Sequence, residues 1–304
     1  MKDLSPLLLF LYKRVEYIDA IISSLLSSPL SKKTDLFIFV DGPKCENDIL
    51  LISSVCNFIN NISGFKSITI NHSEINKGLA ESIISGVGSV IPKYKKVIVL
   101  EDDLIPSSNF LEYMNSALIF YKSNQDIYSI SAFDLVGNNS ALHKDAYFLQ
   151  RSWPWGWATW FDRWEQVDWD LDDYHIFLNN KNLHRKFNYF GSDLAQMLIR
   201  QISGELDSWS IRWTYHIYKK NGFVVYPKIS KINNMGWDEY ATNTVGLDRR
   251  YKRIIDMSFK TNFSFEENII VDKTDAIMLS KKFNILNRAY NKFLEYFITQ
   301  KIIK

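Results

Sequence analysis

Several features that mark common protein classes are scarce or missing in this chain of 304 residues. It has two cysteines, Cys45 and Cys56, which are too few for a zinc quartet or a secreted disulfide framework and so favour a reducing compartment. The five histidines show no HxH or HExxH spacing, and no GxSxG, P-loop or GxGxxG motif occurs. The sequence therefore gives no support to a histidine-based zinc site, or to the usual hydrolase, kinase and Rossmann oxidoreductase classes.

Neither sign of charge dominates, and long apolar runs are missing. The 36 Lys and Arg against 34 Asp and Glu leave a net charge of +2, without the excess that binding to nucleic-acid phosphates requires. We therefore expect no nucleic acid partner. The N-terminal run Leu7–Tyr12 is too short to span a bilayer, which takes about 20 residues. Lys13 and Arg14 follow it where a signal peptide would have small residues, so we interpret it as a buried strand.

Tryptophan is missing from the first 152 residues. All nine lie between Trp153 and Trp237, and six of them between Trp153 and Trp169. The overall composition, 46% hydrophobic and 23% charged, is typical of a globular protein. The second half therefore has either a heavy aromatic core or a surface that grips a flat ligand.

The first 135 residues alternate short apolar runs with helical patterns. Strands are expected at Leu7–Tyr12, Leu36–Val40, Ser67–Ile70, Val97–Leu100 and Tyr128–Ala132, and helices at Val15–Ser28, Glu46–Asn61, Leu79–Ile91 and Ser108–Lys122, the last capped by Ser107 or Ser108. This alternation predicts an α/β fold whose central, mainly parallel sheet has helices on both faces. Further helices are expected at Ser192–Ser203 and Ser208–Asn221, and a strand at Phe223–Tyr226. Ligands of such sheets bind beyond the carboxyl ends of the strands.

The sharpest local signal is Glu101-Asp102-Asp103 after the apolar run Val97–Leu100. Three adjacent acids at the end of a buried strand repel one another and are costly without a cation among them. Oxygen ligands suit Mg²⁺ or Mn²⁺, which carboxylates and substrate phosphates commonly hold together. The alternative, equally weighted on these residues alone, is a solvated turn that precedes a helix.

The second signal is the aromatic segment from Arg151 to Trp164. Gly156 indicates a tight turn or the close approach of a ligand, and aromatic faces suit sugar rings. Trp157, Trp160 and Trp164 recur at helical spacing and are more easily read as core. Trp153 and Trp155, which precede them, are better ligand candidates.

Two further positions have both a structural and a functional interpretation. Asp207 stands where the N-cap of a helix belongs, which is the safer interpretation, but a carboxylate there could also take a proton from a hydroxyl. Lys77 precedes a helix and could meet a phosphate, although an exposed lysine is the simpler reading.

Taken in order, these motifs resemble those of GT-A fold glycosyltransferases. The chain is similar to bacterial sugar transferases for surface polysaccharide and, more distantly, to N-acetylglucosaminyltransferase I, over most of residues 5–240. The matching pieces are Leu-Tyr-Lys-Arg14, Ile-Phe-Val-Asp41-Gly42, Asn-Lys77-Gly-Leu, Val-Leu-Glu101-Asp102-Asp103, Ile-Ser-Ala-Phe-Asp134, the Trp-Gly-Trp segment and Leu-Asp207-Ser-Trp. Each is weak by itself, but the ordered set is specific.

The resemblance implies a role for each matching residue. Asp103 corresponds to the metal ligand of the family's DxD-type motif, which would hold Mn²⁺ or Mg²⁺. The implied contacts to the donor are Arg14 and Asp41 at the base, Lys77 at the uracil or phosphates, Glu101 and Asp102 at the ribose and sugar, and Trp155, Gly156 and Trp157 as walls of the donor sugar. Trp153 and Trp209 are implied for the acceptor. Asp207 falls beside the family's general base, with Asp134 and Asp238 as reserves, because the family has two adjacent acids where this chain has Asp207-Ser208.

The resemblance also implies a reaction and a domain arrangement. We expect a metal-dependent, inverting transfer from a nucleoside diphosphate sugar, UDP-linked, to a hydroxyl of a saccharide or lipid-linked saccharide. Residues 1–246 would form the catalytic domain, with a nucleotide-binding half over about 1–135 and an acceptor half over about 136–246. Residues 247–304 would form a C-terminal extension.

The end of the chain, 280–304, has the pattern of a basic amphipathic helix, with six Lys or Arg among seven charged residues. Contact with an anionic membrane surface and packing against the catalytic domain or a partner subunit are equal alternatives. The expected location is therefore the cytoplasm, with peripheral attachment to the inner face of the cell membrane under the first alternative.

Two other functions compete with a glycosyltransferase. A non-catalytic carbohydrate-binding protein would need the tryptophans and not the acids. A sugar nucleotidyltransferase would also use a metal and a nucleotide sugar, but the sequence lacks the Gly-rich N-terminal loop that cradles a triphosphate.

Overall fold

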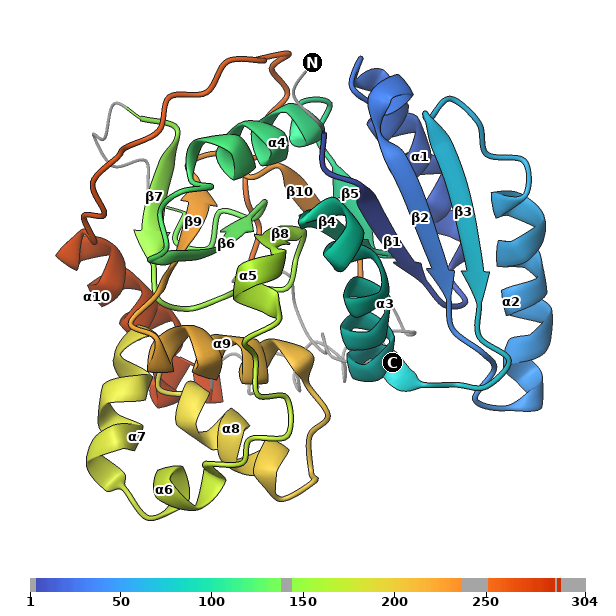
Figure 1. Ribbon diagram of the computed structural model, residues 1–304. Helices are drawn as coiled ribbons and strands as arrows, with labels where there is room; N and C mark the ends of the chain where they lie inside the picture. The colour runs from blue at the N-terminus through green and yellow to red at the C-terminus, as the bar shows by residue number, and fades with distance from the viewer. Residues whose placement is uncertain (1–3, 138–143, 237–250, 288, 291–304) are drawn as a thin grey trace, which may run out of the picture.

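The computed structural model describes residues 4–137, 144–236, 251–287 and 289–290. Within them an eight-stranded sheet has the order β3-β2-β1-β4-β8-β6-β9-β7 (Figure 1). The strands are β1 Leu7–Leu11, β2 Asp35–Val40, β3 Ser67–His72, β4 Lys96–Glu101, β6 Ile127–Ser131, β7 Ala146–Leu149, β8 Trp157–Trp160 and β9 Phe223–Pro227. A separate antiparallel pair joins β5 Leu104–Pro106 to β10 Ile232–Asn234.

The predicted α/β sheet is confirmed, with two strands of its second half, β8 and β7, departing from parallel pairing. β3, β2, β1 and β4 pair in parallel, as β6 and β9 do. β8 runs antiparallel to both β4 and β6, and β7 runs antiparallel to β9. All five residues of β1 are buried, as expected of a central strand that is covered on both faces.

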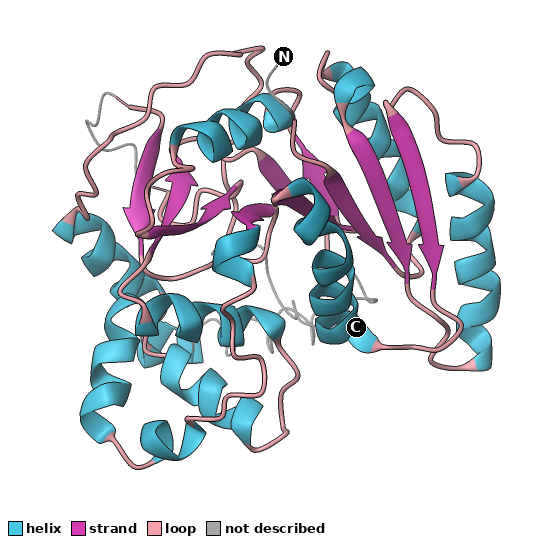
Figure 2. Cartoon of the chain, viewed as in Figure 1, coloured by secondary structure: helices cyan, strands magenta, loops and turns pink. Residues whose placement is uncertain are grey.

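Helices cover both faces of the sheet (Figure 2). The larger ones are α1 Ile18–Ser27, α2 Glu46–Ile59, α3 Gly78–Tyr94, α4 Phe110–Phe120, α8 Leu194–Ile202, α9 Trp209–Lys219 and α10 Lys273–Lys282, and the short ones are α5 Phe161–Trp164, α6 Tyr174–Leu178 and α7 Lys181–Phe187. The chain steps from β1 to β2 to β3 in one direction and then returns to β4. Right-handed crossovers therefore place α1 and α2 on one face and α3 on the other.

Two local predictions were wrong. The N-cap of α4 is Asn109, and neither Ser107 nor Ser108 occupies that position. Trp157 and Trp160 lie on β8, not on a helix, and only Trp164 is helical. All three tryptophans are buried, so their assignment to the core is confirmed. The spacing misled because β8 is buried on both faces, which removes the alternation that marks a half-exposed strand.

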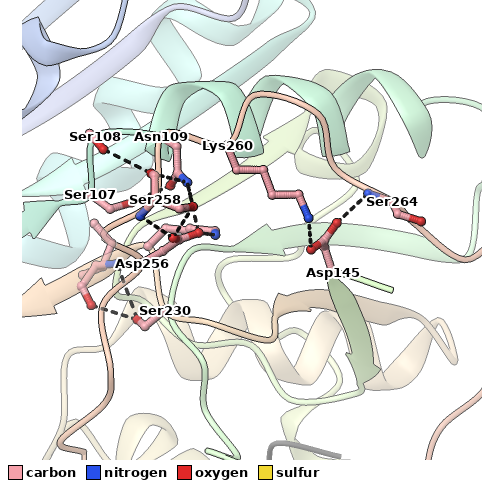
Figure 3. Close-up of polar contacts among 11 residues, drawn as sticks. Ser107, Ser108, Asn109, Asp145, Ser230, Asp256, Ser258, Lys260 and Ser264 are labelled. Carbon is pink, nitrogen blue, oxygen red and sulfur yellow. Dashed lines mark hydrogen bonds and ion pairs between the residues drawn. The ribbon is translucent and has the colours of Figure 1, made fainter. Parts of the chain in front are cut away.

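The segment after residue 250 packs against the body of the protein. The buried Lys231 Nζ forms an ion pair with Asp256 Oδ2, which also accepts a hydrogen bond of 3.0 Å from Asn109 Nδ2. The second oxygen of Asp256 accepts from Ser258 N and Oγ at 2.9 and 2.6 Å (Figure 3). Asp145 accepts from Lys260 Nζ and Ser264 N at 2.6 and 2.7 Å in the same view. We call the Lys231–Asp256–Asn109 group the latch.

No helix among the described residues is long and apolar enough to cross a membrane. Residue 246, where we placed the end of the catalytic domain, lies outside the described residues, as does most of the predicted helix at 280–304. Of that stretch, the first residues end α10, and Phe283 is buried against the body.

His216 on α9 makes folding stability depend on pH. Its ring is buried and stacks on Trp213 at 5.7 Å, and its Nε2 atom has no hydrogen-bond partner among the described residues. Burial, with Lys220 and Lys219 nearby, lowers the pKa of His216 to about 4. Between about pH 6.5 and 4 the unfolded chain therefore binds a proton that the folded chain rejects, and stability falls as the pH falls.

We expect His216→Phe, which keeps an aromatic ring on Trp213, to reduce this loss. At most about 3 kcal/mol is involved, the equivalent of a shift of about 2.5 pKa units. The measurement is the free energy of unfolding in urea at pH 7.5 and at pH 4.5. His175→Phe, at an exposed position, is the control and should keep the wild-type pH dependence. Equal pH dependence in His216→Phe and wild type would contradict the assignment.

Candidate active site

A cavity of about 1160 Å³ opens at the carboxyl ends of β1, β2 and β4 and continues to helices α8 and α9. Most of the residues singled out in the sequence line it: Arg14, Asp41, Lys77, Glu101, Asp102, Asp103, Trp153, Trp155, Asp207 and Trp209. The fold thus brings together positions that are up to 195 residues apart in the chain, as the parallel strands predict. Gly156, Trp157 and Asp134 are not among the lining residues.

The acidic triplet, Glu101 to Asp103, lies between β4 and β5, where the backbone turns at the end of the buried strand. Asp102 Oδ2 accepts a hydrogen bond of 3.2 Å from Tyr12 N. Arg14 Nη1 lies 3.5 Å from Asp102 Oδ1 and 3.2 Å from Asp103 Oδ2. One guanidinium therefore faces two of the three carboxylates.

Burial and mutual repulsion raise the pKa values in the triplet. Burial, with Asp103 nearby, raises the pKa of Asp102 to about 7, although Arg14 opposes the shift. Burial, followed by the charges of Asp103 and Asp102, raises the pKa of Glu101 well above its usual value. The Glu101 Oε1 atom is buried and has no hydrogen-bond partner among the described residues. The protein thus holds acids where their charged form is disfavoured.

A hard divalent cation, Mg²⁺ or Mn²⁺, fits this set of donors. All are carboxylate oxygens, which such ions prefer, and one of them is buried without a partner. No group of three or more His, Cys, Asp or Glu side chains encloses an ion position within the part of the chain that is described. One or two carboxylates completed by substrate phosphates is a common arrangement for Mg²⁺, and Asp103 and its neighbours would supply the protein's share.

Gly236 contacts the triplet, a position that sequence reasoning missed. Met235 N donates to the Asp103 carbonyl at 2.8 Å, so the chain leaving β10 turns over this residue. A Cβ atom at position 236 would lie 2.0 Å from Asp103 Oδ2. Any side chain there would displace the carboxylate. A lone glycine carries no such signal in a sequence, because the contact depends on the pairing of β5 with β10.

Asp41 fixes a loop instead of presenting its carboxylate to a ligand. Its Oδ1 atom accepts from Gly42 N and Lys77 N at 2.9 Å, and its Oδ2 atom accepts from Gly78 N at 2.9 Å and Asn76 Nδ2 at 3.2 Å. A carboxylate has about four acceptor positions, and the chain itself uses them. Asp41 thus holds the start of α3 and Lys77 at the cavity, and the predicted contact with a base is not available to it.

A second polar cluster on the same side of the cavity includes Asp48, which sequence reasoning also missed. Asp48 accepts from Tyr12 Oη at 2.6 Å and pairs with Lys13 Nζ at 3.0 Å. These two hydrogen bonds hold the pKa of Asp48 well below its usual range. Burial and Asp48 raise the pKa of Tyr12 to about 12. The cluster fixes the side chains that follow β1, beside the acidic triplet.

Trp157 and Gly156 are corrections to the predicted wall of the donor sugar. Trp157 is 2% exposed and is stacked by Trp164 and Trp209, with ring centroids 5.3 and 4.7 Å away. Gly156 has φ +63°, and a Cβ there would meet Ile232 at 2.9 Å. The glycine is therefore needed for a turn that packs against β10, and neither residue lines the cavity.

Aromatic rings form the opposite wall of the cavity. Trp153 and Trp155 line it with centroids 5.4 Å apart, and Tyr251 lies 5.4 and 5.3 Å from them. Phe283 lies 5.7 Å from Trp153. Tyr251 and Phe283 come from the segment beyond residue 250 and were not anticipated. Trp209 also lines the cavity, from the first residue of α9.

Asp207 is an exposed carboxylate at the rim of the cavity. Its side chain is 65% exposed and pairs with Arg212 Nη2 at 3.2 Å. The N-cap of α9 is Ser208, whose hydroxyl accepts from Ile211 N, so the capping role considered for Asp207 is wrong. Asp134 is buried and does not line the cavity, and its Oδ1 atom accepts hydrogen bonds of 2.9 Å from Tyr147 Oη and Gly137 N. It is therefore a poor reserve for the general base. Asp238 lies outside the described residues.

No protein-family profile and no curated protein matches this sequence. Solved structures with a similar arrangement include a mannosyltransferase from Pyrobaculum calidifontis in complex with GDP-Man and Mn²⁺, at 9% identity and TM-score 0.41, covering 72% of each chain. A UDP-glucose pyrophosphorylase complexed with UDP-glucose has 11% identity and TM-score 0.37, with 75% of this chain and 91% of that one covered.

A third similar structure is the glucosyl-3-phosphoglycerate synthase from Mycobacterium tuberculosis in complex with Mn²⁺, UDP and phosphoglyceric acid. It has 14% identity and TM-score 0.31, over 51% of this chain and 56% of that one. The chain thus spans about half the length of this enzyme. Because these TM-scores are below 0.5, the similar structures do not assign a function, and the function follows from the protein's own site.

The raised pKa of Asp102 leads to a prediction about stability. Its value of about 7 in the folded state, against 3.8 ordinarily, means that folding favours the protonated acid. Stability therefore falls as the pH rises from about 4 to 7, and the full cost is present above pH 7. Without divalent cations, Asp102→Asn should be more stable than wild type at pH 8, by up to about 4 kcal/mol, and much less so at pH 5.

Thermal unfolding in the presence of a chelator measures this effect. The exposed Asp126→Asn is the matched control, and its melting temperature should follow the wild type at both pH values. A lower melting temperature for Asp102→Asn than for wild type at pH 8 would show that the carboxylate is not disfavoured where it lies.

Proposed function

We propose that this protein transfers a sugar from a nucleoside diphosphate sugar, UDP-linked, to a hydroxyl of a saccharide acceptor, with the help of Mn²⁺ or Mg²⁺. The observation that carries the proposal is the acidic triplet, which has a buried oxygen without a partner and opens into the same cavity as the aromatic wall and Asp207. A carbohydrate-binding protein has no use for the strained acids. The ordered motifs of the sequence agree with this proposal.

The charges of the cavity support a metal-dependent donor site. At the end near β1 and β4, four cationic side chains face five carboxylates: Lys13, Arg14, Lys44 and Lys77 against Asp41, Asp48, Glu101, Asp102 and Asp103. Burial and mutual repulsion disfavour the charged forms of Glu101 and Asp102 there, and a diphosphate would add further negative charge beside them. Asp103 and its neighbours would hold a divalent cation, which would stabilise the charged acids and give the diphosphate a partner.

When bound, the cation supplies Lewis-acid stabilisation of the charge on the departing diphosphate. The chain's own residues do the rest. Lys77, at the start of α3, is placed for the phosphates by the hydrogen bonds of Asp41 to the loop. Trp153 and Trp155 offer flat apolar faces to sugar rings and keep water from the reacting carbon. Asp207 takes the proton of the acceptor hydroxyl, which attacks in line and inverts the anomeric carbon.

The finer assignments are part of the proposal. The donor is UDP-GlcNAc or a related hexose, as the resemblance to N-acetylglucosaminyltransferase I implies, and the product belongs to surface polysaccharide or another glycan. A screen of nucleotide sugars with Mn²⁺, scored by donor hydrolysis, needs no knowledge of the acceptor. Release of free UDP is expected, whereas release of pyrophosphate from a nucleoside triphosphate and a sugar phosphate would indicate a nucleotidyltransferase. Binding of saccharide without turnover would indicate a carbohydrate-binding protein.

Asp103→Asn should abolish metal-dependent turnover, with a loss of about 100-fold or more in kcat, because the proposed metal ligand is gone. Calorimetry with UDP should show that Mn²⁺ no longer strengthens nucleotide binding. Asp126→Asn serves again as the control with wild-type activity. Full activity of Asp103→Asn in the presence of a chelator would eliminate the metal mechanism.

Asp207→Asn should lower kcat for transfer by about 10² to 10⁴-fold, the usual contribution of a general base. Binding of UDP should stay unchanged, since Asp207 is assigned to the acceptor hydroxyl and not to the donor. Glu205→Gln, which removes an exposed neighbouring carboxylate, should turn over at the wild-type rate. An unaffected kcat in Asp207→Asn would transfer the role to another acid, of which Asp238 is the remaining candidate.

A further inference from the structure

The far end of the cavity is built differently from the end that holds the acidic triplet. We call it the acceptor subsite and define it by Arg151, Trp153, Asp193, Met197, Tyr251 and Phe283, all of which line the cavity. Three of the six are aromatic. The two charged members are an arginine and an aspartate in direct contact, so this subsite, unlike the donor end, has no surplus of either sign.

The ion pair in the acceptor subsite is bidentate and buried. Arg151 Nη1 and Nη2 donate to Asp193 Oδ1 and Oδ2, each at 2.8 Å, and Nη1 also lies 3.3 Å from the Phe190 carbonyl. The two residues are 4% and 8% exposed. The Arg151 Nε atom is buried without a hydrogen-bond partner among the described residues. One N–H donor of this guanidinium is therefore left without an acceptor among the described residues.

The surroundings of the pair are shaped to hold it. Gly191 has φ +147°, and a Cβ there would lie 2.1 Å from Arg151 Nη1, so only glycine leaves room for the guanidinium. Phe283 covers the pair from the C-terminal segment, with its ring centroid 3.9 Å from Arg151 Cζ. The Trp153 ring lies 5.4 Å from the same atom, and its Nε1 atom is also buried without a partner. The aromatic rings of Phe283 and Trp153 thus lie beside two N–H donors, Arg151 Nε and Trp153 Nε1, that have no acceptor among the described residues.

The pairing of Arg151 with Asp193 determines whether the acceptor subsite favours charged or uncharged sugars. A lone arginine beside a sugar subsite would favour uronic acids, sialic acids or phosphorylated sugars, because guanidinium recognises carboxylate and phosphate in a bidentate manner. Here both terminal nitrogens are already used by Asp193. An anionic sugar would lose its hydration and meet the Asp193 carboxylate, whereas an uncharged hydroxyl or ring oxygen can accept from the remaining N–H groups at no such cost.

We propose that the acceptor subsite selects an uncharged saccharide and that the Arg151–Asp193 pair excludes anionic ones. This inference rests on the proposed function, and it narrows the acceptor to a chemical class. The sugar ring lies against Trp153 and Tyr251, with its hydroxyls toward the Arg151–Asp193 pair. The other acidic group of this end, Asp207, is likewise matched by a cation, Arg212, at 3.2 Å.

The test compares matched pairs of probes: methyl glucoside with methyl glucuronide, and methyl galactoside with methyl galacturonide. Within each pair only the group on C5 differs, neutral in one and anionic in the other. Binding to the full chain in the presence of Mn²⁺ and UDP is measured by saturation-transfer NMR titration. In the wild type the neutral member of at least one pair should bind about tenfold or more tightly than its acid, a difference of about 1.4 kcal/mol.

Two variants should shift this preference toward the acid. Asp193→Asn removes the carboxylate and exposes the charge of Arg151, but it also leaves a buried cation that can weaken folding. Met197→Lys avoids this difficulty, because Met197 is partly exposed and lies one turn after Asp193 on α8, with Met197 N donating to the Asp193 carbonyl at 2.9 Å. The added cation should bring the neutral-to-acid ratio near one or below it. Gln196→Lys, which adds the same charge at an exposed position of α8 that is not among the lining residues, is the control and should keep the wild-type ratio.

Each outcome is decisive. A wild-type protein that binds the acids as tightly as the neutral sugars overturns the proposal, and so does a lack of saturable binding by all four probes. An unchanged ratio in folded Met197→Lys overturns the charge-based explanation. Donor hydrolysis by the same preparations separates this proposal from the proposed function: hydrolysis without neutral preference sinks only the acceptor assignment. If the protein neither hydrolyses a donor nor binds UDP in a Mn²⁺-dependent way, the proposed glycosyltransferase function is wrong.

Discussion

Confinement of three carboxylates at the end of a buried strand is the constraint on which the rest of the site depends. β4 is buried between β1 and β8, and its end brings Glu101, Asp102 and Asp103 together with only part of their surface exposed. Arg14 offsets part of their repulsion, and the pKa of Asp102 still rises to about 7. The group costs folding stability while it is unliganded, and a bound cation would stabilise its charged form.

The two ends of the cavity use charge in opposite ways. Near the triplet the acids lie together, their charged forms are disfavoured, and a divalent cation would stabilise those forms. Beyond the aromatic wall each charge has a fixed partner of opposite sign within the protein, as in Arg151 with Asp193 and Arg212 with Asp207. One end therefore responds to ionic strength and metal supply, and the other responds mainly to shape and hydroxyl pattern.

The sequence alone was sufficient for the parallel half of the sheet, because its strands and helices have clear periods and the residues after the strands share one edge. It could not distinguish a helix from a fully buried strand at Trp157 and Trp160, where no exposed side breaks the apolar pattern. Nor could it assign Tyr251 and Phe283 to the cavity. Tyr251 and Phe283 reach the cavity because the segment after residue 250 packs back against the body of the protein, and no local sequence pattern indicates such a long-range contact. The roles of Asp41 and Gly236 were hidden for the same reason.

The latch has a consequence for how this protein can be divided. Lys231 immediately precedes β10, whose pairing with β5 holds the turn over Asp103, and the partner that neutralises Lys231 lies beyond residue 250. A chain cut near residue 246 would keep every strand of the sheet. It would, however, leave the buried ammonium of Lys231 without its partner Asp256, and it would remove Tyr251 and Phe283 from the aromatic wall. The folded unit that contains the cavity therefore extends past residue 250.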